Sequence, residues 1–106
     1  MGNHENQEQR EYERFPYRED ILIDGAKLCS SMDISEGGIY ISAIQLFEKD
    51  SVLDVAIPFK GEKLIVKGKV QHVQQGIGMG IMFIDLNDDQ KAAIKEIIES
   101  ISNSSL

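Results

Sequence analysis

The chain has 106 residues, of which 42% are hydrophobic, and a formal net charge of −7. This length fits one domain with one hydrophobic core, and the acidic balance argues against binding to long nucleic acid, which requires a basic surface. No apolar run approaches the ~20 residues that span a bilayer, and no signal peptide is recognisable, so we expect a globular cytoplasmic protein without membrane insertion.

The first residues and the strands that follow differ in pattern. Residues 1–9 are polar without apolar periodicity, so we expect a flexible N-terminal arm. Beyond them, alternating apolar residues bounded by turn residues predict six short strands. In chain order these cover residues 21–23, 26–30, 38–41, 52–59, 64–72 and 77–83.

Three of these strands carry further information. Ala26, Leu28 and Ser30 are the periodic positions of the second strand, which follows Asp24-Gly25, a favoured hairpin turn. In the fifth strand the alternation predicts one face that holds Leu64, Val66, Gly68, Val70 and His72. The last strand places two glycines, Gly78 and Gly80, on one face, which indicates close approach by another group.

A helix is predicted at the end of the chain. Asn87 is suited to the N-cap with Gln90 at N3, and isoleucines recur at helical spacing from Ile94 to Ile101. Six strands and one helix favour an all-β fold, a six-stranded antiparallel β-barrel plus a C-terminal α-helix. The expected division is the arm, a domain over residues 10–101 and a flexible tail at 102–106.

One candidate binding motif lies where the arm meets the domain. Arg10 and Arg14 form an R-x-x-x-R pattern, although Arg14 and Arg18 also satisfy it. The planar guanidinium donates in parallel to phosphate oxygens or to guanine O6 and N7, and it stacks on bases. We prefer Arg10 and Arg14, because Arg14 is followed directly by the apolar-Pro-aromatic entry to a strand, which leaves Arg18 inside that strand. The alternative is that these are solvated surface charges.

A second candidate motif is D-x-S-x-x-G, formed by Asp33, Ser35 and Gly38, with Gly37 before the last position. The Asp33 carboxylate can accept hydrogen bonds from N1 and the N2 amino group of guanine, which adenine cannot offer. Ser35 can bond a ligand or hold the loop, and the two glycines permit close approach. The alternative is an ordinary turn that leads into a strand.

The two motifs, in this order and followed by barrel strands and a helix, resemble the PilZ domain family. The resemblance runs from about Arg10 to Ile101 and implies that the chain binds cyclic di-GMP, a bacterial second messenger. It assigns binding to Arg10, Arg14, Asp33, Ser35, Gly37 and Gly38. Many members have another arginine before the first one, and Gln9 stands there in this chain, so we expect a single bound dinucleotide.

No catalytic or metal-binding arrangement is recognisable, so we expect neither an enzyme nor a resident cofactor. Cys29 has no Cys or His at ligand spacing and is expected to be a buried thiol.

The preferred function is ligand sensing, in which cyclic di-GMP orders the arm and alters a surface for a downstream protein effector. The alternative is a PilZ-fold adaptor that binds only proteins, through the exposed sheet or the isoleucine-rich helix. Whether Tyr12, Arg18 or His72 touches the ligand stays open.

Overall fold

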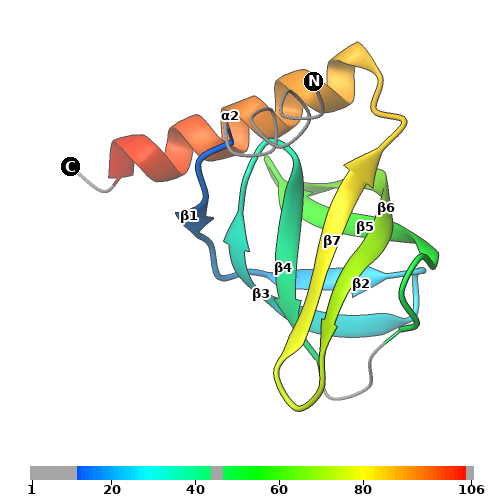
Figure 1. Ribbon diagram of the computed structural model, residues 1–106. Helices are drawn as coiled ribbons and strands as arrows, with labels where there is room; N and C mark the ends of the chain where they lie inside the picture. The colour runs from blue at the N-terminus through cyan, green and yellow to red at the C-terminus, as the bar shows by residue number, and fades with distance from the viewer. Residues whose placement is uncertain (1–11, 44–46, 105–106) are drawn as a thin grey trace, which may run out of the picture.

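The computed structural model describes residues 12–43 and 47–104, with the side chain of residue 104 left out. In this part of the chain, strands are followed by one C-terminal helix (Figure 1). The elements are β1 (Phe15–Pro16), β2 (Asp20–Ile23), β3 (Lys27–Ile34), β4 (Gly38–Ser42), β5 (Val52–Phe59), β6 (Glu62–Gln74), β7 (Gly78–Ile84) and α2 (Asp88–Ser104).

Six strands close into an antiparallel barrel, as predicted. Their order is β3-β2-β5-β6-β7-β4, and β4 pairs back onto β3. The short β1 is an additional strand that the sequence did not predict, and it lies along the same edge of β3 as β2. Pro16 has no backbone N–H to give to this ladder, which accounts for the shortness of β1. The expected arm at residues 1–9 lies outside the described residues.

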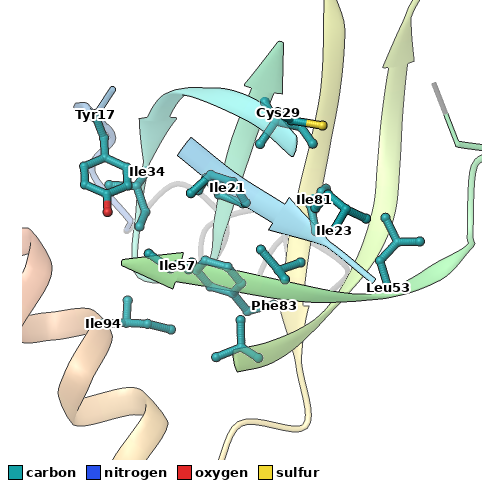
Figure 2. Close-up of a cluster of buried hydrophobic side chains, with 14 of the residues drawn as sticks. Tyr17, Ile21, Ile23, Cys29, Ile34, Leu53, Ile57, Ile81, Phe83 and Ile94 are labelled. Carbon is teal, nitrogen blue, oxygen red and sulfur yellow. The ribbon is translucent and has the colours of Figure 1, made fainter. Parts of the chain in front are cut away.

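The barrel interior is filled mainly by isoleucine and valine, and α2 closes one end of it. Ile21, Ile23 and Ile57 are fully buried in this core, which Figure 2 shows together with Ile94 of the helix. Figure 1 shows α2 lying across that end. Branched aliphatic side chains suit both the strand backbone and a small barrel interior.

The sequence predicts the start of α2 correctly but not its end. At its start, Gln90 N donates to Asn87 Oδ1 (2.7 Å) and Asn87 N donates to Gln90 Oε1 (2.8 Å). This reciprocal pair is the predicted capping box. At its end the helix continues through Ser104, so residues 102–104 are helical rather than part of a tail. Residues 105–106 lie outside the described part.

The periodic positions predicted for this strand, Ala26, Leu28 and Ser30, do not form its buried face, because the hairpin loop is one residue longer than Asp24-Gly25. Ile23 pairs with Lys27, so Ala26 belongs to the turn. A shift of one residue turns every side chain of a strand to the other face. Cys29 is therefore buried, as expected for its thiol, while Leu28 points outward with 66% of its surface exposed.

Candidate functional site

The Ser35 hydroxyl organises the turn between β3 and β4. Ser35 is only 2% exposed, and its Oγ accepts hydrogen bonds from Gly37 N (3.1 Å) and Gly38 N (3.2 Å). Ser35 N donates to Gly38 O at 2.8 Å, which closes the turn. A Cβ on Gly38 would lie 2.3 Å from Ile81 O, so only glycine fits there.

Arg14 is attached to this turn by two side-chain hydrogen bonds. Its Nε donates to Asp33 Oδ1 at 2.6 Å and its Nη1 donates to Ser35 Oγ at 3.3 Å. The side chains of Arg14 and Asp33 are 47% and 37% exposed, so the ion pair adds little to stability. Its effect is to hold the guanidinium beside the turn, with the ring of Tyr12 against Gly37.

Arg10 and Arg18 are the two possible partners of Arg14 in the R-x-x-x-R pattern. Arg10 lies outside the described residues. Arg18 is exposed between β1 and β2 and does not line the cleft that Arg14 lines. Both registers include Arg14, which the structure brings to Asp33 and Ser35, whereas the position of Arg18 outside the cleft argues against the Arg14/Arg18 register. The expectation that Arg18 lies inside a strand was wrong, because β1 ends at Pro16 and β2 begins at Asp20.

A β-bulge decides the direction of Asp33. Ser31 pairs with Ile41 and Asp33 pairs with Tyr40, so Met32 is an extra residue in β3. Without this residue, Asp33 would point inward like Ser31; with it, Asp33 points to the outer face. Asp33 therefore lies in β3 rather than in the turn that the sequence predicts there.

A second bulge does the same for His72. Val70 pairs with Ile81 and His72 with Gly80, which makes Gln71 the extra residue of β6. The predicted placement of His72 on the inner face with Val70 was therefore wrong, and His72 is exposed. Antiparallel partners share a face, so the pairings align four residues in one row across the outer surface: Asp33, Tyr40, Gly80 and His72.

An open cleft of about 1370 Å³ lies between this surface and the first half of α2. Its basic lining residues are Arg14, Lys91 and Lys95, and its acidic ones are Glu36, Asp85 and Asp88. The remaining lining residues are Tyr12, Ser35, Gly37, Gly38, Tyr40, Gln71, His72, Gly80, Ile81, Met82, Phe83, Leu86, Ala92 and Ile94. The cleft thus offers guanidinium, ammonium, backbone amide and aromatic groups to a ligand.

The described part of the chain offers no cluster of metal-binding side chains, and its one cysteine is buried. Over residues 12–43 and 47–104, no three His, Cys, Asp or Glu side chains are placed to hold a metal ion. Burial raises the pKa of the Cys29 thiol, which keeps it protonated and poorly nucleophilic. Among the residues that the structure describes, no helix has both the length and the apolar character needed to cross a membrane.

Sequence reasoning missed several residues of the cleft. Lys91 and Lys95 are four residues apart on α2 and so share a helix face, but only the docking of the helix brings that face to the cleft. Tyr40 gave no signal beyond its place in a strand. The two glycines of β7 were a usable signal for Gly80, which lines the cleft, whereas a Cβ on Gly78 would meet Ile41 O at 2.1 Å.

One family model matches most of the chain. The family model described as PilZ domain matches residues 8–100. The PilZ domain of CeSA from a cellulose-synthesizing bacterium has a similar structure, with a TM-score of 0.65 and 21% identity over 85% of this chain and 98% of that one. No curated protein matches the chain.

Two longer proteins share the fold as well. The Bacillus subtilis inhibitor of motility, MotI/DgrA, gives a TM-score of 0.68 and 21% identity over 90% of this chain and 52% of that one. Borreliella burgdorferi PlzA, solved in complex with cyclic di-GMP, gives 0.62 and 16% over 90% and 45%. The chain therefore spans about half the length of each.

Proposed function

Because the chain belongs to the PilZ domain family, a family of cyclic di-GMP receptors, we propose that it binds cyclic di-GMP in the cleft beside the Ser35 turn. One observation carries the proposal: Asp33 and Ser35 hold the Arg14 guanidinium next to the Gly37-Gly38 backbone. The ligand-binding residues are Arg10, Arg14, Asp33, Ser35, Gly37 and Gly38. The proposal is supported by PlzA, which shares this fold over 45% of its length and was solved in complex with cyclic di-GMP.

Each group has a chemical reason to take part. Arg14 uses Nε and Nη1 within the protein, and its planar guanidinium still offers further N–H donors to a phosphate or a guanine edge. Asp33 gives one oxygen to Arg14, which leaves the other to accept from guanine N1 and N2. Gly38 lets the turn pack against Ile81 O, and Gly37 lets the Tyr12 ring lie against the turn, so both glycines shape the backbone beside which the ligand binds.

The charge of the chain shapes how the ligand is recognised. The chain carries −7 and cyclic di-GMP is a dianion, so they repel at long range. Affinity therefore comes from short hydrogen bonds in the cleft, which salt screens less than it screens distant charges. We expect the dissociation constant to change only modestly with added salt.

The signal is transmitted by the N-terminal arm in this proposal. Cyclic di-GMP draws Arg10 toward Arg14 and orders residues 1–9, and the ordered arm creates or covers a surface for a downstream protein effector. The population shift is limited by the ligand's differential affinity for the two states. Trypsin tests this step, since ligand should slow cleavage after Arg10; equal cleavage rates with and without ligand would contradict it.

Titration calorimetry tests the binding itself. We expect saturable heat with cyclic di-GMP and much weaker binding of GTP and cyclic di-AMP. Arg14→Ala and Asp33→Ala should lose binding while keeping the wild-type circular dichroism spectrum. Arg18→Ala is the matched control, because Arg18 is exposed outside the cleft. No heat from the wild-type chain at millimolar ligand would reject the proposal.

A protein adaptor is the second candidate, and an exposed apolar row favours it. Cross-strand pairing aligns Leu28, Leu22, Ala56 and Ile65 in one row. Leu28 and Ile65, at its two ends, are 66% and 57% exposed, whereas Leu22 is partly exposed and Ala56 is buried. The isoleucine-rich helix is not available, because Ile94, Ile97 and Ile98 are buried in the core. An adaptor would show no ligand-induced rise in melting temperature, and Leu28→Ser would abolish partner capture.

A further inference from the structure

Gly80, in the middle of β7, has no internal reason to be glycine. A Cβ on Gly38, Gly68 or Gly78 would lie 2.1–2.3 Å from a neighbouring atom, so the packing requires those glycines. At Gly80 the nearest atoms to a Cβ are 3.6 Å away, which is an ordinary contact, and φ is outside the left-handed region. Glycine weakens a strand interior and often marks close approach by a ligand.

The surroundings of Gly80 form a slot on the outer face of the barrel. The rings of Tyr40 on β4 and His72 on β6 flank Gly80, each with its Cδ2 3.6 Å from the Cβ position. The Tyr40 hydroxyl donates to Gln74 Oε1, which limits rotation of that ring. The bulge at Gln71 turns His72 to this face. All three residues of the slot line the cleft.

We propose that the slot over Gly80 holds one guanine base of cyclic di-GMP, packed against the rings of Tyr40 and His72; this inference rests on the proposed function. The row of paired residues places Asp33 two strands from Gly80, roughly 10 Å away at the usual strand spacing. One dinucleotide can therefore contact both the Arg14–Asp33 pair and the slot. Stacking accepts any base, so the slot adds affinity and the Asp33 carboxylate reads guanine.

A single methyl group tests the slot. Gly80→Ala places a methyl where the base would lie, and we expect cyclic di-GMP affinity to fall at least tenfold by calorimetry. The same change should leave the melting temperature of the free protein unchanged or raise it, because alanine loses less backbone freedom on folding. A lower melting temperature would show that the fold itself requires glycine and would overturn the inference.

Removal of a ring provides the second test. His72→Ala should weaken binding roughly tenfold or more, the usual effect of losing an aromatic–base stack. Val73→Ala is the matched control, because Val73 is the exposed neighbour of His72 on β6 and does not line the cleft. In NMR spectra, ligand should shift the ring protons of Tyr40 and His72; unmoved ring signals at saturation would contradict the slot.

The two proposals fail in different ways. If the wild-type chain binds no cyclic di-GMP, both the proposed function and the slot are overturned. If the wild-type chain and Gly80→Ala bind equally while Arg14→Ala does not, the slot alone is overturned.

Discussion

The Ser35 hydroxyl should contribute to stability as well as to the site, and its removal by Ser35→Ala can be worked through from the structure. The hydroxyl accepts from Gly37 N, Gly38 N and Arg14 Nη1. The buried Gly38 N–H loses its acceptor, which costs about 1–3 kcal/mol. Gly37 and Arg14 reach water, so their lost bonds cost about 0.5 kcal/mol each. The expected total is about 2–4 kcal/mol of unfolding free energy.

Urea denaturation followed by circular dichroism measures this loss. The midpoint should fall while the slope m stays constant, because the surface exposed on unfolding is unchanged. Thermal unfolding should shift down by roughly 10–20 °C for a domain of this size. Ser30→Ala is the control: Ser30 is exposed on β3, the strand that leads into the Ser35 turn, and its loss should stay within about 0.5 kcal/mol. A Ser35→Ala variant as stable as Ser30→Ala would refute the role given to the hydroxyl.

Three further changes have defined outcomes. Gly78→Ala should destabilise the barrel by at least ~2 kcal/mol in urea, because its Cβ would lie 2.1 Å from Ile41 O; wild-type stability would contradict this. Burial, with a smaller effect from Glu19, raises the pKa of Tyr17 to about 12 from 10.0. Ionisation of Tyr17 is therefore less favourable in the folded state than in the unfolded state. The resulting contribution to the free energy of unfolding is fully present below pH 10, and roughly 2–3 kcal/mol is lost as the pH rises to 12. Tyr17→Phe should remove this part of an alkaline denaturation profile. Asn87→Ala should cost about 1 kcal/mol by loss of the helix cap, and an unchanged urea midpoint would argue against the capping box.

Much of the fold could be predicted from local patterns. Alternation gave the bounds of β5 without error, and Asn87 with Gln90 gave the start of α2, because both signals depend only on neighbouring residues. The face of β3 could not be predicted in this way. It depended on whether Ala26 belongs to the turn or to the strand, and the ladder with β2 decided this.

The sequence by itself determined the chemistry of the Ser35 turn: a carboxylate, a hydroxyl and two glycines in a fixed order, with arginines before them. Only the tertiary structure decided what faces this turn. Bulges at Met32 and Gln71 turned Asp33 and His72 outward into one row with Gly80. A bulge is a mismatch between two paired strands, so neither strand shows it alone. The residue types of the site can therefore be recognised in short stretches of the sequence, whereas their relative positions depend on pairing between strands that are far apart in the chain.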